Sequence, residues 1–121
     1  MEHKARENLE AAASLLSAED PCSNAATSRA YYAAYQACWA LLVAEDYHPP
    51  QMNRGTYFAH GEMADLAQRA GVLSHEESEE LRFLESQRVI ADYFSEGITL
   101  GVAQQCLTAA QSLVARLDEA S

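Results

Sequence analysis

Lysine is almost missing from this sequence of 121 residues. Lys4 is the single lysine, the other basic residues are arginines, and 18 acidic residues give a formal net charge of −10. Non-specific binding of nucleic acid depends on Lys and Arg side chains that displace counterions from phosphates. We therefore expect the chain to repel nucleic acid on average, unless a few arginines form a local basic site. The acidic excess by itself predicts a solvated surface.

Cysteines and long apolar runs are also scarce. Cys22, Cys38 and Cys106 are odd in number and have no CxxC spacing, which argues against a disulfide framework and a zinc site. No apolar run is long enough to cross a membrane, and residues 1–6 lack the apolar segment of a secretion signal. We therefore expect a cytoplasmic protein without metal, cofactor or membrane partner.

The alternation of apolar and polar residues that marks a half-buried strand is absent, whereas helical spacing recurs along the chain. Apolar residues three and four positions apart predict helices over about residues 3–18, 24–46, 55–70, 74–94 and from 99 onward. The second of these is apolar nearly all round, which is typical of a central helix. The predicted fold class is all-α, with residues 1–121 forming one domain. Its architecture is an antiparallel up-and-down bundle of four to five helices.

Several residues are predicted to begin or end these helices. Ser74 and Glu77 fit a capping box, in which each side chain satisfies a backbone donor of the other residue. Thr99, and either Ser23 or Asn24, are further candidate caps. Gly71 is well placed to end the third helix.

Common catalytic signatures are missing. The sequence contains no GxxxxGK[ST] loop, no GxGxxG and no GxSxG. His60 begins a His-x-Glu pattern, but the paired cysteines that would complete a zinc-deaminase site are lacking. His3, His48 and His75 are interpreted as surface residues, since metal sites need several convergent ligands. No histidine is therefore predicted to carry chemistry.

The stretch of residues 28–35 places three tyrosines on one helix. Tyr31 and Tyr35 are four residues apart and share a face. Core packing is the interpretation that we favour for these rings. The alternative is a platform for stacking bases, for which Tyr32 and the neighbouring Arg29 are candidate RNA- or nucleotide-binding residues.

Arg88 interrupts the apolar stripe of the fourth helix and therefore needs a partner. Asp92 lies one helical turn further on and can pair with it. Two interpretations remain open. The pair is either a structural contact at the edge of the core, or part of a cleft in which a partly desolvated Arg88 faces an anion such as phosphate.

Together these stretches resemble the HEPN family. Residues 28–35, followed by an apolar helix, are similar to the second helix of HEPN proteins. Residues 88–93 are similar to the Arg-x-x-Ala-Asp-Tyr segment of one small prokaryotic branch, and residues 70–74 to its Gly-x-Leu link. The resemblance covers nearly the whole chain. It implies an antiparallel bundle of four or five helices that forms a homodimer.

The resemblance also implies a function. Many HEPN proteins are metal-independent ribonucleases with an Arg-x(4–6)-His motif, and some are toxins encoded beside a small nucleotidyltransferase that neutralises them. Arg88 matches the motif arginine, whereas Tyr93 stands where a histidine would stand. An unperturbed tyrosine, with a pKa of about 10, is a poor base at neutral pH.

The leading hypothesis is therefore a dimeric protein that binds RNA or nucleotide through Arg88. It would be a toxin-type protein of a toxin–antitoxin pair, or an accessory partner of a nucleotidyltransferase. One alternative is a metal-independent endoribonuclease that uses Arg88 with Asp92 and Tyr93 as catalytic residues. The other is a non-catalytic structural module in which Arg88 only fixes the packing of the helices.

Overall fold

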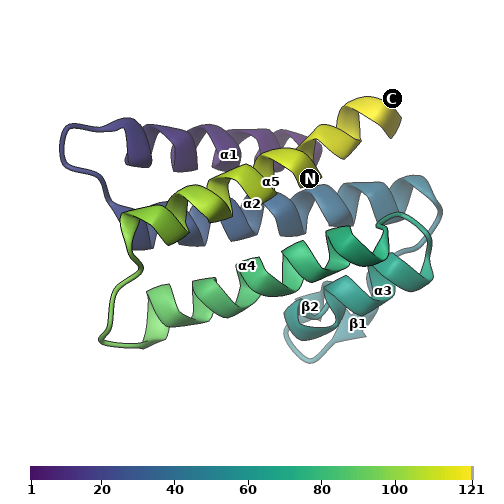
Figure 1. The fold of residues 1–121 in the computed structure, drawn as a ribbon. Coiled ribbons are helices and arrows are strands. Elements are labelled where there is room, and N and C mark those ends of the chain that lie inside the picture. Colours follow the sequence, from purple (N-terminus) through teal and green to yellow (C-terminus); the bar gives the residue numbers. More distant parts are fainter. Residues whose placement is uncertain (121) are drawn as a thin grey trace.

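The computed structural model describes residues 1–120, and they form an all-α bundle (Figure 1). Four long helices run up and down in turn, and the connection between the second and the third holds four short elements. The long helices are α1 (Glu2–Ser17), α2 (Ser23–Ala44), α4 (His75–Tyr93) and α5 (Leu100–Ala120). The short elements are β1 (Gln51–Met52), β2 (Gly55–Thr56), the 3-10 turn η1 (His60–Glu62) and α3 (Met63–Arg69). The predicted fold class is confirmed.

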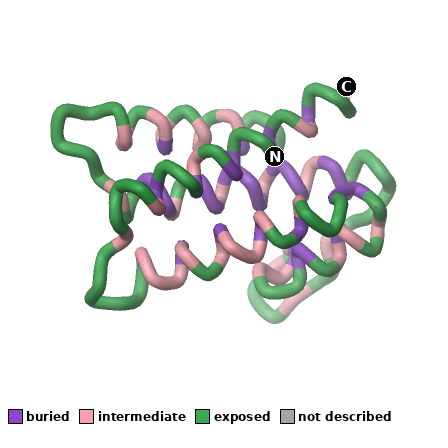
Figure 2. Tube along the Cα trace, in the orientation of Figure 1, coloured by how far each residue is buried: buried purple, intermediate pink, exposed green. Residues whose placement is uncertain are grey.

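Helix α2 is central, as its composition predicts. It packs against α1, α3, α4 and α5, and Figure 2 shows buried positions along much of its length. Its alanines let the neighbouring helices approach closely, and five of them, at positions 26, 30, 33, 34 and 37, are at most 1% exposed. Cys38 also lies in this core and Cys106 faces it from α5. Burial raises the pKa of the Cys38 thiol to about 12 and that of Cys106 to about 11.

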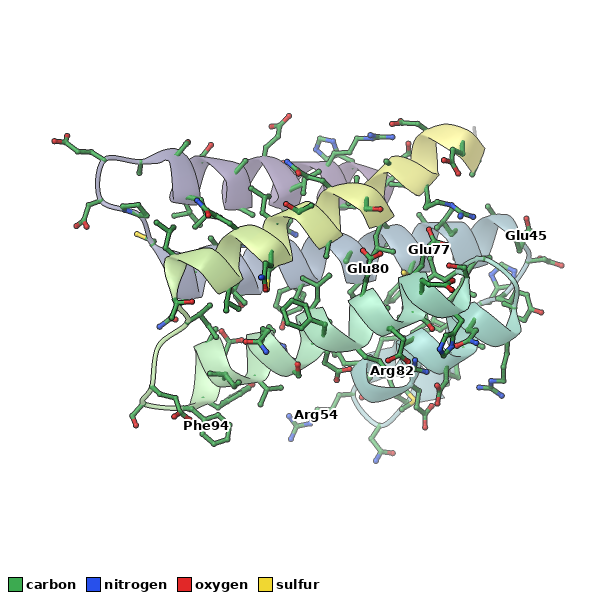
Figure 3. The ribbon with its side chains drawn as sticks, viewed as in Figure 1. Glu45, Arg54, Glu77, Glu80, Arg82 and Phe94 are labelled. Atoms are coloured by element: carbon green, nitrogen blue, oxygen red, sulfur yellow. The ribbon has the colours of Figure 1, made fainter. Side chains whose placement is uncertain are left out.

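Ion pairs join the helices at the surface of the bundle, and two of them involve Glu77 and Arg82 of α4, which are labelled in Figure 3. Arg116 of α5 donates from Nη1 to Glu77 Oε1 of α4 at 3.1 Å. Arg82 of α4 pairs with Asp65 of α3. Over residues 1–120, no helix has both the length and the apolar character that a membrane span requires.

The helix predicted over residues 55–70 is wrong in its first half. Residues 51–56 form an antiparallel hairpin in which Gln51 pairs with Thr56, and α3 begins only at Met63. Gly55 adopts a φ of 130°, a conformation that is costly for residues other than glycine and incompatible with a helix. The following segment is extended and is held against α2, because the Tyr35 hydroxyl donates to the Phe58 carbonyl and the Phe58 ring is 3% exposed.

Two of the predicted caps are confirmed and one is wrong. Ser74 N donates to Glu77 Oε1 at 2.8 Å and Glu77 N donates to Ser74 Oγ at 3.1 Å, which is the predicted capping box. Thr99 Oγ1 accepts from Val102 N at 3.2 Å. Neither Ser23 nor Asn24 caps α2, because Cys22 occupies that position without a side-chain hydrogen bond. Asn24 Oδ1 instead accepts from the backbone N of Ile98, at 2.8 Å.

Candidate functional site

Arg88 lies in the interior of the bundle, on the face of α4 that meets α2. It follows Leu81 and Leu84 on the buried stripe of α4 and is itself 8% exposed. Its guanidinium carbon is 5.0 Å from the centre of the Tyr31 ring and 5.9 Å from that of Tyr32. The two π faces offer the desolvated cation a favourable electrostatic environment.

The hydrogen bonding of Arg88 is incomplete. Its Nη1 is 3.9 Å from Asp92 Oδ2, which confirms the predicted ion pair but is too long for a hydrogen bond. Asp92 Oδ2 instead accepts from Ser28 Oγ at 3.3 Å. Within residues 1–120, the buried Nε of Arg88 has no hydrogen-bond partner. Leaving a buried donor unsatisfied costs about 1–3 kcal/mol, so the site is suited to an additional acceptor.

Arg116 differs from Arg88 in the contacts of its Nη groups, although its buried Nε likewise has no hydrogen-bond partner within residues 1–120 and lies 3.2 Å from Glu119 Oε2. Its guanidinium donates to both carboxylate oxygens of Glu77, at 3.1 and 3.2 Å, and to the Val72 carbonyl at 3.2 Å. Arg88 is more deeply buried than Arg116, yet its nearest carboxylate is further away. The two arginines therefore differ in how closely a carboxylate approaches their Nη groups, at 3.9 Å for Arg88 and 3.1 Å for Arg116.

A histidine from the segment after the hairpin lies beside this arginine. His60 Nδ1 is 2.7 Å from the Tyr31 hydroxyl oxygen. The imidazole stacks on Tyr35, with ring centres 4.2 Å apart and planes at 26°, and meets Tyr32 edge-on at 5.8 Å. Burial lowers the pKa of His60 below its ordinary value, and the positive charge of Arg88 lowers it further. At neutral pH the ring is therefore held mainly in its neutral form.

Glu85 completes the titratable cluster. It precedes Arg88 by three residues on α4, and its Oε1 lies 4.0 Å from the position that a Cβ atom would take at Gly61, next to His60. Burial raises the pKa of Glu85, while Arg88 acts in the opposite direction. Burial also raises the pKa of Tyr31, and the nearby Glu85 adds to this shift. The Tyr31 hydroxyl consequently stays protonated at neutral pH.

A cleft of about 390 Å³ opens next to this cluster. Its lining consists of Ala25, Ser28, Arg29, Tyr32 and Asp92. Tyr32 belongs both to this lining and to the ring cluster around His60 and Arg88. The structure thus brings together four of the residues predicted from the sequence, namely Arg29, Tyr32, Arg88 and Asp92. Arg29 additionally donates to Asn8 Oδ1 of α1 at 3.1 Å.

Tyr93, the remaining predicted site residue, lies apart from the cluster. It is 73% exposed at the end of α4. Five residues of α-helix separate the directions of two side chains by about 140°, so Tyr93 does not share the inward face of Arg88. The neighbouring Phe94 is 55% exposed and projects away from the bundle (Figure 3).

Sequence reasoning missed His60 and Glu85. The spacing of Glu85 from Arg88 was a usable signal, because residues three apart on a helix share a face. His60 gave no such signal. It lies in an irregular segment, and its position beside α2 depends on the Tyr35–Phe58 contact, which joins residues far apart in the sequence.

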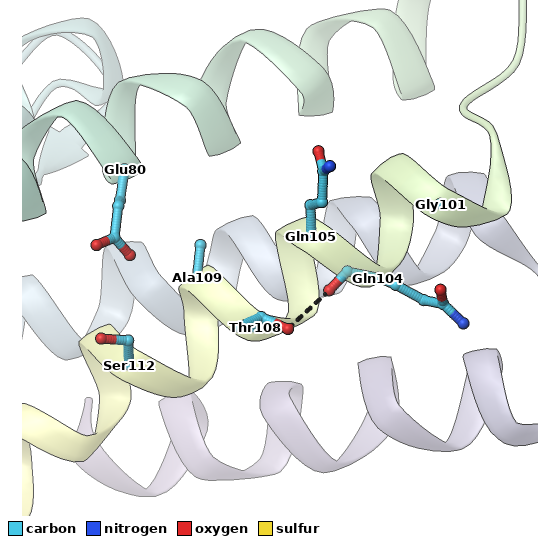
Figure 4. A pocket seen from close by; sticks show the side chains of 7 residues that line it. All are labelled: Glu80, Gly101, Gln104, Gln105, Thr108, Ala109 and Ser112. Atoms are coloured by element: carbon cyan, nitrogen blue, oxygen red, sulfur yellow. Dashed lines mark hydrogen bonds between the residues drawn. The ribbon is translucent and has the colours of Figure 1, made fainter.

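A second cleft, of about 600 Å³, lies between α4 and α5 (Figure 4). Gln104, Gln105, Thr108 and Ser112 contribute polar side chains, and Glu80 contributes a carboxylate. Burial raises the pKa of Glu80, and the charge of Glu77 adds to this effect. This lining contains no arginine, lysine or histidine, whereas Arg29 lines the cleft beside Arg88, which is therefore better suited to an anion. Among residues 1–120, no group of three or more His, Cys, Asp or Glu side chains is arranged to hold a metal ion.

Comparison with known proteins agrees with the helical architecture. The family model described as HEPN domain matches residues 3–120. The match includes all four long helices and every residue of the cluster around Arg88. No curated protein matches the chain. Because the family match extends over nearly the full sequence, this chain belongs to the HEPN domain family.

Proposed function

We propose that this HEPN protein binds a phosphate group of RNA or of a nucleotide at Arg88, in the neighbouring cleft that Arg29, Tyr32 and Asp92 help to line. The observation that carries the proposal is the buried Arg88, whose Nε has no hydrogen-bond partner among residues 1–120 and whose nearest carboxylate there, that of Asp92, is 3.9 Å away. A guanidinium can present two parallel N–H groups to a phosphate, and such charge-assisted bonds are stronger than neutral ones.

The other residues of the cleft fit the same ligand. Tyr32 offers a half-buried ring on which a base can stack. Ser28 and Arg29 contribute a hydroxyl and a guanidinium to the lining of the cleft beside Arg88. Phosphates elsewhere along an RNA would meet an acidic surface, given the net charge of −10. The proposed interaction is therefore local and involves few phosphates.

The proposal extends to the assembly. We propose a homodimer that serves as a toxin-type protein or as an accessory partner of a small nucleotidyltransferase. This part rests on the resemblance of residues 88–93 to the small prokaryotic branch. The exposed aromatic side chains of Tyr93 and Phe94 support it, because they offer apolar surface near the cleft. Sedimentation at micromolar concentration tests the dimer, and a strictly monomeric chain would contradict it.

A metal-independent ribonuclease is the second candidate. The observation in its favour is the position of His60 beside Arg88, since a histidine can transfer protons at neutral pH.

Binding is tested by fluorescence anisotropy with a short, labelled, single-stranded RNA that is 2′-O-methylated throughout and cannot be cleaved. We expect Arg88→Gln to weaken binding at least tenfold. Arg54→Gln is the matched control, because Arg54 is exposed in the hairpin turn and points away from the bundle (Figure 3). Equal affinities of wild type and Arg88→Gln would contradict the proposed site.

A further inference from the structure

Resting on the phosphate site proposed above, we propose that the cleft beside Arg88 selects guanine as the base of the bound nucleotide. Asp92 accepts hydrogen bonds from the N1–H and 2-amino groups of guanine, Arg29 donates to its O6 atom, and Tyr32 stacks on its ring. All three side chains line the same cleft of about 390 Å³. Clefts that hold small ligands usually have volumes of about 300–1,000 Å³.

The carboxylate of Asp92 is fixed on one side and open on the other. Its Oδ2 accepts from Ser28 Oγ of α2 at 3.3 Å and lies 3.9 Å from Nη1 of Arg88. Its Oδ1 makes no hydrogen bond with residues 1–120, and the side chain is 30% exposed. A carboxylate only accepts, and its two oxygens have about four lone-pair sites. The cleft therefore presents an oriented acceptor to a ligand edge that consists of donors.

Arg29 supplies donors to the same cleft. Its Nη1 donates to Asn8 Oδ1 of α1 at 3.1 Å, and its remaining N–H groups make no hydrogen bond within the described residues 1–120. The O6 and N7 acceptors of guanine are the commonest base-specific partners of a guanidinium. One carboxylate and one guanidinium leave the lining of the cleft without net charge. The cleft thus suits a neutral base better than a second phosphate.

The Watson–Crick edge of guanine differs from those of the other bases in the property that Asp92 can distinguish. Guanine has two adjacent donors, N1–H and the 2-amino group, which one carboxylate can accept together. Adenine and cytosine have their amino group next to a ring-nitrogen acceptor, and uracil has one N–H between two carbonyl oxygens. In these three bases an acceptor faces the carboxylate. A site that is built around one set of hydrogen bonds rejects ligands that leave its groups unpaired.

The ring of Tyr32 supplies affinity without selectivity. It is half-buried, and the Tyr31 ring meets it edge-on with the ring centres 5.3 Å apart, so its position is fixed. Every base has a π face, and stacking on an aromatic side chain therefore tolerates any base. The choice between bases depends on Asp92 and Arg29.

The test exchanges the hydrogen-bonding pattern of Asp92. Calorimetry gives the affinities for the 5′-monophosphates of guanosine, adenosine and xanthosine, which share the phosphate and differ in the base. Wild type should bind the guanosine nucleotide about 5- to 150-fold more tightly than the adenosine nucleotide, the range that one bidentate pair gives. The amide in Asp92→Asn can accept from N1–H of xanthine and donate to its O2. This variant should therefore prefer the xanthosine nucleotide over the guanosine nucleotide.

A purely electrostatic effect of Asp92 predicts a different result. Removal of a negative charge beside the phosphate site would raise the affinity for all three nucleotides alike. Asp46→Asn is the matched control, because Asp46 is exposed and lies just beyond the C-terminal end of α2, far along this helix from Ser28. Asn also tolerates the φ of 66° that Asp46 adopts. This control should keep the base preference of wild type.

Two outcomes overturn the choice of base and leave the phosphate site standing. One is equal affinity of wild type for the guanosine and adenosine nucleotides with loss of both in Arg88→Gln, and the other is an Asp92→Asn variant that still prefers guanosine. A wild type that binds neither nucleotide nor RNA contradicts the phosphate site and the inference together. If Asp92→Asn fails to fold, inosine monophosphate decides with wild type, because its base differs from guanine only by the missing 2-amino group. Equal affinity for the inosine and guanosine nucleotides would contradict the role of Asp92.

Discussion

His60 Nδ1 lies 2.7 Å from the hydroxyl oxygen of Tyr31. This contact joins the irregular segment before α3 to the central helix α2, at the point where Arg88 of α4 meets the same tyrosine ring. Three segments far apart in the sequence therefore meet at Tyr31. The resulting cluster contains an arginine, a histidine and a carboxylate, the last from Glu85, in one partly desolvated place.

Replacing Arg88 should affect binding more than stability. Arg88 makes no short hydrogen bond with Asp92, but its guanidinium lies over the Tyr31 and Tyr32 rings, so Arg88→Gln should lower the free energy of unfolding by about 1 kcal/mol. The affinity for 2′-O-methylated RNA should fall at least tenfold. Urea denaturation measures the first quantity and anisotropy the second. A large loss of stability with unchanged affinity would instead favour the purely structural role of Arg88.

The lowered pKa of His60 predicts a pH-dependent contribution to stability. The imidazole of His60 binds its proton more tightly in the unfolded state, where its pKa is near 6.5, than in the folded state, where its pKa is lower. The contribution of His60 is thus fully present above that pH and is lost as the pH falls toward the folded-state pKa. The difference in unfolding free energy between wild type and His60→Asn should shrink over this window. NMR titration of the imidazole in Arg88→Gln should give a higher pKa than in wild type. An unchanged pKa would mean that the two side chains do not interact.

Tyr32 should contribute to RNA binding through its aromatic ring and not through its hydroxyl. Stacking of one base on an aromatic side chain is worth about 1–3 kcal/mol by alanine substitution. Tyr32→Ala should therefore weaken RNA binding about 5- to 150-fold, whereas Tyr32→Phe should bind like wild type. Tyr93→Ala provides the comparison, because Tyr93 is 73% exposed and lies outside the cleft. Anisotropy with the methylated RNA measures all three, and equal losses for Tyr32→Ala and Tyr93→Ala would contradict the stacking role.

The capping box of α4 should be structural only. Ser74→Ala removes the acceptor of the Glu77 backbone N–H and should lower the free energy of unfolding by about 1 kcal/mol. Its affinity for RNA should remain that of wild type, because the box is at the opposite end of α4 from Asp92. Urea denaturation and anisotropy check the two statements. A binding defect in Ser74→Ala would indicate that the cleft depends on the start of this helix.

The helices were predictable because their signals are local. The capping box at Ser74 and Glu77 and the all-round apolar surface of α2 depend on neighbouring residues only, and both are found in the structure. Residues 55–62 were predicted wrongly as the first half of a helix. Their conformation depends on the positive φ of Gly55 and on the contact of Phe58 with Tyr35, and the second is a tertiary interaction.

The candidate site was predictable only in part for the same reason. Arg88 and Asp92 lie one turn apart on one helix, so their pairing could be read from spacing. The position of His60 depends on how the segment after the hairpin folds against α2. Spacing along the sequence therefore gave no reason to predict that this histidine lies beside Arg88. The burial that raises the pKa of Glu85 is likewise a property of the packed bundle.

The Nε–H group of Arg88 offers the most direct test of the phosphate site, because it is a buried donor with no partner among residues 1–120. Its ¹H–¹⁵N NMR signal can be assigned by its loss in Arg88→Lys. Addition of a 2′-O-methylated dinucleotide should shift this signal downfield, as expected for a new hydrogen bond to phosphate, and should leave the Nε signal of the exposed Arg54 in place. A signal of Arg88 that does not move at saturating dinucleotide would contradict the account.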